Sequence, residues 1–429
     1  MNFKLDELIY QSPECTGLNR EPNRSPLFPF KKESDARHAG QNRGPWYRTL
    51  NGDWKFNYYE KPQDIPENFM APSVNDSKWK TIDVPSCWDM RGYDYPHYTN
   101  AQMPWGELPP KVPAGRNPTG IYRRTFDIPK NWAGRRILLH FDGVESCFAA
   151  YVNGTAAGMS KDSRGSTEFD VTELVRTGRN QITVLVIKWS DGTFIEDQDH
   201  WWHAGIVRSV YLYSTGKNHI ADVHVTATLD DTFENGLLKV DMQTGHPEKI
   251  DPENAPFLAV RVYDENDTLV FEQKQNCGKH PALEWGTADY RRIHTGLSGM
   301  IEKVHPWSAE IPSLYTLTVT LYDKKGKEQE AVSQRIGFRT VKVEKRHLLV
   351  NGQPVLICGV NRHEHDDLNG RTVSMELMRK DLVLMKQFNI NAIRTSHYPD
   401  APEFYDLCDE YGFYVIDEAN LECHAFYND

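Results

Sequence analysis

The feature that most constrains this sequence is a change, near residue 339, from a strand-only pattern to an alternation of strands and helices. After a predicted hairpin turn at Asn351-Gly352, the apolar run PVLICGVNRH (354–363) precedes a helical pattern, a short strand, NAIRTSHYP (391–399), a second helix and a third strand, FYVIDEANLECH (413–424). Apolar strands that alternate with amphipathic helices are typical of parallel sheets. The order βαβαβ therefore predicts either a doubly wound sheet or the start of a (β/α)₈ barrel.

The two predicted helices have recognisable ends. Ser374 stands where the first helix needs an N-cap, and Gly412 ends the second helix, which runs from about Ala401 to Tyr411. The apolar face of the first helix is predicted from residues at helical spacing: Leu377, Met378, Leu382, Met385 and Phe388.

Polar clusters directly follow all three predicted strands, at residues 361–365, 394–397 and 417–424. A barrel builds its active site from the carboxyl ends of several strands, so this placement favours a barrel. A complete barrel needs roughly 250 residues, whereas about ninety follow Arg339. We therefore expect an incomplete barrel whose remaining strands lie on another polypeptide, unless the barrel interpretation is wrong.

The length of 429 residues corresponds to about three domains. Short β-branched and aromatic runs separated by turns predict a jelly-roll β-sandwich over 46–216, with a two-residue hairpin at Asn153-Gly154, and an immunoglobulin-like β-sandwich over 217–338. Residues 1–45 are polar and rich in Pro and Arg, which predicts an arm lying on the other domains. Residues 339–429 then form the start of the barrel.

The composition disfavours several classes of partner and site. The 49 Lys and Arg against 60 Asp and Glu leave a net charge of −11, which disfavours nucleic acid and anionic membrane surfaces. Seven cysteines without a CxxC pair argue against a disulfide framework and a zinc knuckle. With no apolar stretch long enough for a signal peptide or a membrane span, we expect a cytoplasmic protein.

The polar clusters allow several chemistries. Glu422-x-His424 can ligate Mg²⁺ or Mn²⁺ if a further carboxylate joins it, although a solvated strand end carries the same residues. His363 and His365 form an HxH pair, for which substrate hydrogen bonding or a structural network is better supported than zinc. Ser396 lacks the G-x-S-x-G context of a serine hydrolase.

Two aromatic segments of the first β block combine rings with Asp and Asn, namely 92–100 and 190–205. This mixture can stack on a sugar face and bind its hydroxyls. Taken alone, however, these segments are better explained by a sandwich core and a turn, in which Trp201 and Trp202 are buried.

Taken together, the segments WSDGTFIEDQDHWWHAGI, GVNRHEHDDLNG, IRTSHYP and DEANLECH are similar, in this order, to the N-terminal part of the bacterial β-galactosidases of glycoside hydrolase family 2. The similarity also includes YPHYTN, NPTGIYRRTF, FDGVES and WSAEIPSLY, and so covers nearly the whole chain.

This resemblance implies roles for individual residues. Asn100 and Asp199 would enter the galactose subsite, with Asp199 also a ligand of Na⁺. His363 and His397 would contact the sugar hydroxyls and support the transition state, with Arg394 beneath them. The active-site Mg²⁺ (or Mn²⁺) would be held by Glu422 and His424.

The resemblance also identifies what is missing. Retaining glycosidases need two catalytic carboxyls, and in this family the acid/base glutamate belongs to an Asn-Glu dipeptide, which this sequence lacks. We therefore expect both catalytic glutamates to be absent and the chain alone to be inactive. The complete enzyme would hydrolyse terminal β-D-galactosides such as lactose, as a homo-oligomer or with a complementing C-terminal chain. The alternatives are a β-glucuronidase or β-mannosidase of the same family and a non-catalytic sugar-binding or complementing subunit.

Overall fold

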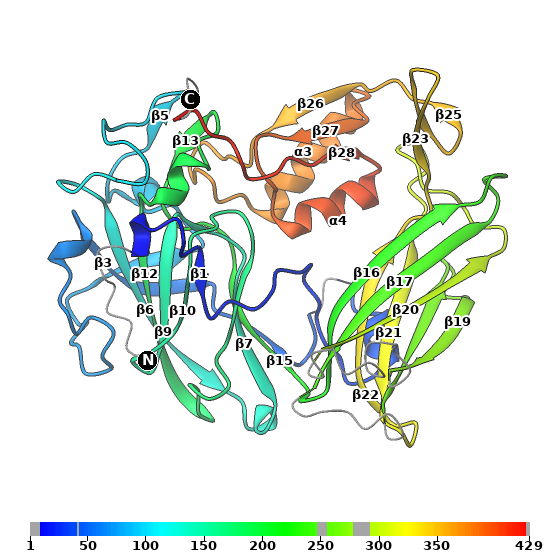
Figure 1. Cartoon of the computed structure of the whole chain (residues 1–429), viewed down its shortest axis with the longest axis horizontal. Helices are drawn as coiled ribbons and strands as arrows, with labels where there is room; N and C mark the ends of the chain where they lie inside the picture. The colour runs from blue at the N-terminus through cyan, green and yellow to red at the C-terminus, as the bar shows by residue number, and fades with distance from the viewer. Residues whose placement is uncertain (1–8, 41–42, 247–254, 278–291, 426–429) are drawn as a thin grey trace.

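In the computed structural model, two antiparallel β-sandwiches are followed by a short α/β segment that lies beside both of them (Figure 1). The structure describes residues 9–40, 43–246, 255–277 and 292–425. Parts of the predicted arm, 1–8 and 41–42, and the last four residues of the predicted barrel start lie outside these ranges.

The first sandwich packs a seven-stranded sheet, ordered β1-β10-β9-β12-β6-β3-β4, on a four-stranded sheet, ordered β11-β7-β15-β2. Trp54, Tyr122 and Phe148 of the larger sheet meet Leu139 and Leu212 of the smaller one in a common buried core. The strands of the larger sheet are β1 (Gly17–Leu18), β3 (Gly52–Tyr59), β4 (Lys80–Val84), β6 (Thr119–Ile128), β9 (Cys147–Val152), β10 (Thr155–Ser160) and β12 (Gly178–Ile187). Those of the smaller sheet are β2 (Tyr47–Thr49), β7 (Arg136–Phe141), β11 (Thr167–Asp170) and β15 (Val210–Thr215).

Turn chemistry determines the hairpin between β9 and β10. Asn153 and Gly154 both have positive φ, 51° and 85°, as a two-residue type I′ turn requires. The predicted hairpin at this dipeptide is confirmed, since Thr155 pairs with Val152 across it. Two further strand pairs extend from this sandwich: β5 (His97–Thr99) with β13 (His200–Trp202), and β8 (Val144–Glu145) with β14 (Gly205–Ile206).

The N-terminal arm contacts both sandwiches. Its strand β1 adds to the edge of the larger sheet by pairing with β10. Further along, Phe30 pairs with Ala331 of the second sandwich, and the short helix α1 (Glu33–Arg37) packs on that sandwich.

The second sandwich packs the sheet β16-β17-β20 on the sheet β19-β18-β21-β22. Its strands are β16 (His219–Leu229), β17 (Gly236–Gly245), β18 (Phe257–Tyr263), β19 (Leu269–Asn276), β20 (Arg292–Ile301), β21 (Tyr315–Tyr322) and β22 (Glu328–Ile336). All of these strands except β20 carry the β-branched and aromatic runs that predict the sandwich, whereas Gly296 and Gly299 interrupt the apolar pattern of β20. Gly299 is required there: a Cβ would lie 2.4 Å from the Phe271 ring.

The α/β segment begins with a small antiparallel sheet of β23 (Val341–Glu344), β24 (His347–Val350) and β25 (Gln353–Pro354). The predicted turn at Asn351-Gly352 joins the last two strands and is confirmed. Three parallel strands follow, β26 (Gly359–Arg362), β27 (Ala392–Thr395) and β28 (Tyr414–Ile416). Residues 355–358 of the predicted apolar run, between β25 and β26, are not part of a strand, and Leu356 is 79% exposed.

The helices α3 (Met375–Gln387) and α4 (Pro402–Tyr411) connect these parallel strands. The Leu377 amide donates to the Ser374 side chain, and Gly412 has the left-handed φ of 76°, so both predicted ends are confirmed. Met378 and Leu382 are buried, but the prediction for Phe388 is wrong. It lies in the C-terminal cap of α3, past the last helical turn, and is 71% exposed.

Candidate active site

Polar residues gather where the carboxyl ends of the three parallel strands face the β5–β13 pair of the first sandwich. His363 directly follows β26, His397 lies two residues after β27, and residues 417–424 follow β28. On the opposite side, Asn100 directly follows β5 and Asp199 directly precedes β13. Contacts between these segments show that they lie together: Asn100 with Asp199, His363 with His397, His397 with Glu422, and Glu196 with Glu422.

Asp199 is the centre of the contribution from the first sandwich. Its two carboxylate oxygens accept hydrogen bonds from the Tyr98 hydroxyl at 2.6 Å and from the Asn100 amide at 3.3 Å. Tyr98 and Trp201 face each other across the β5–β13 pair, with ring centroids 5.4 Å apart. Trp201 is 45% exposed whereas Trp202 is buried, so only the second of the two tryptophans is a core residue.

His363 and His397 lie edge to face, with their ring centroids 5.4 Å apart. Arg394 donates to His397 Nδ1 at 3.2 Å, which places the guanidinium next to the imidazole. Desolvation, together with the neighbouring His397 and Arg371, lowers the pKa of His363 below its ordinary value. His363 is therefore neutral near pH 7 and able both to donate and to accept a hydrogen bond.

Carboxylates surround His397 on the side of β28. Ligand atoms of His397, Glu418 and Glu422 all lie within 4.8 Å of one another. Glu418 is paired with Arg394 at 2.6 Å. His424 Nε2 lies 3.6 Å from Glu422 Oε1, close enough for both atoms to ligate one ion. Carboxylate oxygens are ligands that suit Mg²⁺ and Mn²⁺, and Glu422 offers one beside the His424 nitrogen, so these residues are compatible with the predicted cation.

The end of this polar segment contacts the first sandwich. His424 Nδ1 lies 3.2 Å from Asp197 Oδ2. Burial raises the pKa of Asp197 to about 6, although the contact with His424 opposes this shift. Three residues here were not predicted as site residues. They nevertheless lie in the predicted polar and aromatic segments: Tyr98 in 92–100, Asp197 in 190–205 and Glu418 in 417–424.

Alternate residues of the cluster 361–365 have different environments. Arg362 is buried and pairs with Asp400 at 2.7 Å, and Glu364 is buried and accepts two hydrogen bonds from Arg208. His363 and His365 are exposed. Arg362 and Glu364 therefore form a structural network, which is one of the two uses predicted for this cluster, whereas the two histidines are exposed.

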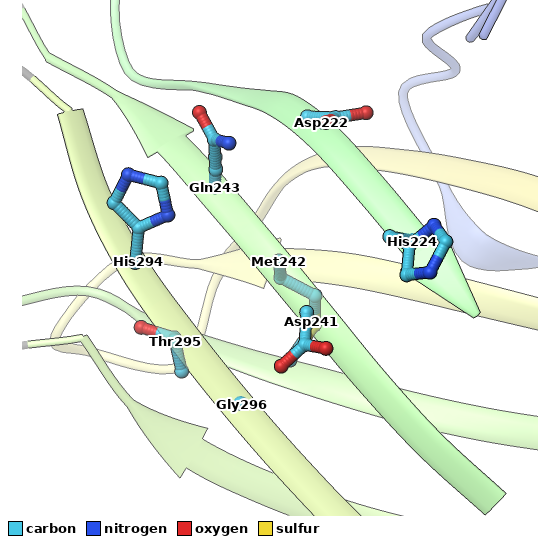
Figure 2. A pocket seen from close by; sticks show the side chains of 8 residues that line it. All are labelled: Asp222, His224, Asp241, Met242, Gln243, His294, Thr295 and Gly296. Carbon is cyan, nitrogen blue, oxygen red and sulfur yellow. The ribbon is translucent and has the colours of Figure 1, made fainter. Parts of the chain in front are cut away.

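Two further polar groups lie outside this site. Cys87, Asp89 and His203 are buried together in the first sandwich, where His203 Nδ1 lies 2.7 Å from Asp89 Oδ2. A hollow on the second sandwich is lined by residues of three strands, among them Asp222 and His224 of β16, Asp241 of β17 and His294 of β20 (Figure 2). The residues lining this hollow include none that the sequence predicts to bind substrate.

Family models match three consecutive parts of the chain. Residues 47–216 match the model described as "Glycosyl hydrolases family 2, sugar binding domain", residues 218–339 match "Glycosyl hydrolases family 2", and residues 341–429 match "Glycosyl hydrolases family 2, TIM barrel domain". None of the helices in the described part of the chain has the length and apolar character needed to span a bilayer.

Curated relatives are similar over nearly all of the chain. A β-galactosidase from Priestia megaterium is 40% identical over 96% of this chain and 40% of its own length. One from Alteromonas mediterranea is 37% identical over 97% of this chain and 39% of its own length. The chain thus spans about 40% of the length of these relatives.

Solved structures share the fold. A β-glucuronidase from Bifidobacterium dentium aligns with a TM-score of 0.72 and 23% identity, covering 87% of this chain and 61% of its own. A family 2 glycosyl hydrolase from Bacteroides cellulosilyticus aligns with a TM-score of 0.70 and 23% identity, covering 87% and 48%. These structures and the three models confirm the predicted fold class. Because the models follow one another along nearly the whole chain, and the relatives agree with them, the chain belongs to glycosyl hydrolases family 2.

Proposed function

We propose that the complete protein is a β-galactosidase that hydrolyses terminal β-D-galactosides, such as lactose, with retention of configuration. The observation that carries this proposal is the identity of 37–40% with proteins named β-galactosidase over 96–97% of this chain. The site geometry supports it, because Asn100 and Asp199 on the first sandwich and His363 and His397 after the parallel strands offer side chains that can hydrogen-bond sugar hydroxyls.

Asn100 and Asp199 bind hydroxyls of the galactose ring from the side of the first sandwich. Tyr98 orients Asp199 through its hydroxyl, since this hydrogen bond fixes one carboxylate oxygen at 2.6 Å. His363 and His397 bind hydroxyls from the side of the parallel strands and stabilise the transition state. Arg394 holds His397 in place and pairs with Glu418.

Glu422 and His424 hold Mg²⁺ or Mn²⁺, and Asp199 holds Na⁺. A bound divalent cation supplies positive charge that adjusts the pKa of the acid/base carboxyl. Carboxylate oxygens are hard ligands, and both proposed sites offer them at partly exposed positions.

The two catalytic carboxyls come from the portion of the relatives' length that this chain does not span. Retaining glycosidases place an acid/base and a nucleophile about 5–5.5 Å apart. Glu418 and Glu422 are engaged by Arg394 and by the cation site, respectively, and neither serves as the nucleophile. The chain acts with a polypeptide that supplies the remaining strands, either as part of a longer protein that forms homo-oligomers or as a complementing subunit.

The cytoplasm is the proposed location. All seven cysteines are unpaired in the structure, as a reducing compartment favours. No nucleic acid or membrane partner is proposed.

A β-glucuronidase or β-mannosidase is the competing assignment, because solved β-glucuronidases share this fold. The test is the rate of hydrolysis of nitrophenyl β-D-galactoside, β-D-glucuronide and β-D-mannoside by the complete protein with Mg²⁺ and Na⁺. We expect kcat/KM for the galactoside to exceed the other two by at least 100-fold. A glucuronide or mannoside preference would contradict the proposal.

A further inference from the structure

The segment that carries Glu422 and His424 is held by the first sandwich. The strand β28 ends at Ile416, six residues before Glu422. The Glu422 amide donates to Ile195 O at 2.9 Å, and the Asp197 amide donates to Glu422 O at 3.0 Å. Glu422 thus pairs in parallel with Glu196 of the first sandwich, and its backbone position is set there.

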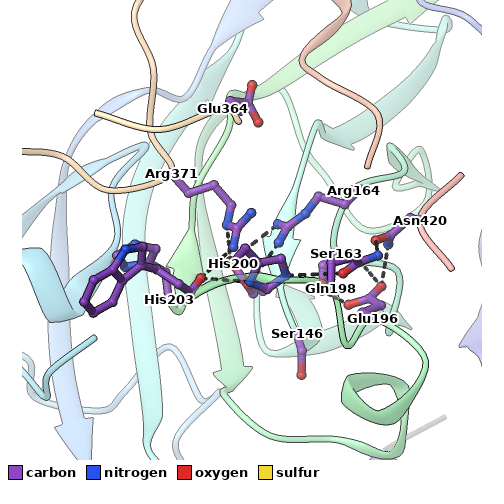
Figure 3. Close-up of polar contacts among 12 residues, drawn as sticks. Ser146, Ser163, Arg164, Glu196, Gln198, His200, His203, Glu364, Arg371 and Asn420 are labelled. Atoms are coloured by element: carbon purple, nitrogen blue, oxygen red, sulfur yellow. Dashed lines mark hydrogen bonds and ion pairs between the residues drawn. The ribbon is translucent and has the colours of Figure 1, made fainter. Parts of the chain in front are cut away.

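Asn420 links the same two segments through its side chain. Its amide nitrogen donates to Glu196 Oε1 at 2.7 Å, and its amide oxygen accepts from the Gln198 side chain at 2.9 Å (Figure 3). Both ends of this side chain are therefore used, which fixes its orientation.

Glu196 is itself held in place. Only 7% of this residue is exposed, and its carboxylate accepts hydrogen bonds from both the backbone amide and the hydroxyl of Ser163 (Figure 3). Because Ser163 belongs to the first sandwich, the chain of contacts runs from that sandwich through Glu196 to Asn420 and ends two residues before Glu422.

We propose that Glu196 and Asn420 are positioning residues that hold Glu422 and His424 in the geometry that binds the divalent cation, so that the first sandwich and not the barrel fixes this half of the cation site. The inference rests on the cation site of the proposed function. Its consequence is that the 429-residue chain binds a divalent cation without the catalytic carboxyls, because its ligand segment is already ordered.

The first experiment compares Mn²⁺ affinities of the 429-residue chain by electron paramagnetic resonance of free Mn²⁺. Asn420→Leu removes both side-chain hydrogen bonds and leaves Glu422 and His424 intact. We expect it to weaken Mn²⁺ binding at least tenfold. Asn391→Leu is the matched control, since Asn391 also makes two hydrogen bonds but lies before β27, at the opposite end of the parallel strands. We expect the control to stay within twofold of the parent.

A pair of substitutions at Glu196 separates positioning from charge. In Glu196→Gln the amide oxygen still accepts from Asn420 and from the Ser163 amide, while the amide nitrogen donates to the Ser163 hydroxyl. We expect this variant to bind Mn²⁺ within threefold of the parent. Glu196→Leu makes none of these contacts and is expected to lose at least tenfold.

Amide hydrogen exchange gives a readout that needs no metal. The Glu422 amide, which donates to Ile195 O, is expected to exchange at least tenfold faster in Asn420→Leu and at the parent rate in Asn391→Leu. Equal Mn²⁺ affinity in the parent, Asn420→Leu and Glu196→Leu overturns the positioning role. A parent chain that binds no Mn²⁺ at millimolar concentration overturns the cation assignment together with this inference, whereas the sugar preference of the complete protein is decided by the glycoside comparison.

Discussion

Asp199 is oriented by hydrogen bonds from Tyr98 and Asn100, and the bond from Tyr98 can be removed without changing the charge of the site. Tyr98→Phe deletes the 2.6 Å hydrogen bond to Asp199 and keeps the ring beside Trp201. An exposed hydrogen bond to a carboxylate contributes about 1 kcal/mol, which corresponds to about fivefold. We therefore expect kcat/KM for a galactoside to fall about fivefold in the complete protein.

The matched control is Tyr95→Phe, because Tyr95 is similarly exposed and lies on the same segment. Equal effects of the two substitutions, in steady-state kinetics, would show that the bond to Asp199 does not orient the carboxylate.

His140 makes the stability of the first sandwich depend on pH. It is buried against Tyr211, between Asp142 at 2.7 Å and Glu168 at 2.9 Å. Burial alone would lower the pKa of His140, but these two carboxylates outweigh it and raise the pKa to about 9. Because the folded-state pKa exceeds the unfolded one, the stabilisation is complete below about pH 6.5 and is lost as the pH rises through about 9.

The expected loss of unfolding free energy between these pH values is about 2 to 3 kcal/mol, measured by urea denaturation at several pH values. His140→Gln lacks the titrating group, so its stability should fall less over the same interval. A parent and variant with parallel pH profiles would contradict the assignment.

At the scale of elements, local signals in the sequence were sufficient for most of the fold. Asn153-Gly154 and Asn351-Gly352 predicted two turns because their residues tolerate positive φ, and Ser374 and Gly412 predicted helix ends through their own backbone preferences. These features depend on a few adjacent residues.

The features that the sequence did not reveal depend on distant contacts. Strand β20 is hidden by its glycines, one of which makes room for Phe271 on another strand. The pairing of Glu196 with Glu422 joins segments 226 residues apart, and no local pattern predicts it. For the site, the strand ends identified the polar clusters, but which members face the site and which are buried in ion pairs required the fold.

The α/β segment is the part of the chain that we expect to unfold locally before either sandwich does. Its core is small, and exposed apolar residues lie on α3 (Val383 and Leu384), in the C-terminal cap of α3 (Phe388) and at the end of β28 (Ile416). Apolar helix faces and an unpaired strand edge destabilise such a segment. Limited proteolysis of the 429-residue chain is therefore expected to cut within 340–429 before it cuts either sandwich. Cleavage that begins in a sandwich would contradict this.

Two buried ion pairs among the described residues join this segment to the first sandwich, Arg208 with Glu364 and Arg371 with Glu145, and the first of them can be tested separately. Glu364→Leu leaves Arg208 buried and uncompensated, which costs about 3 kcal/mol. We expect cleavage within 340–429 to accelerate at least tenfold. Glu410→Leu is the control, because its contact with Arg335 of the second sandwich is exposed and contributes little. Equal cleavage rates in the two variants would show that the buried pair does not fasten the segment.

At the scale of the whole molecule, the site is shared between two parts of the chain. The first sandwich contributes Asn100 and Asp199, and the parallel strands contribute His363, His397 and Glu422. The central claim is that these residues form the sugar and cation half of a retaining site, and that the catalytic carboxyls come from the remainder of the protein.

Hydrolysis of nitrophenyl β-D-galactoside tests this claim most directly. The 429-residue chain, purified from a host without its own β-galactosidase, is assayed with Mg²⁺ and Na⁺, alone and mixed with the part of the Priestia megaterium relative that it does not span. We expect no turnover by the chain alone and turnover by the mixture, and we expect Asp199→Ala to abolish the turnover of the mixture. Turnover by the chain alone that is lost in Glu422→Gln but insensitive to added metal would contradict this claim, because Glu422 would then be a catalytic carboxyl and not a cation ligand.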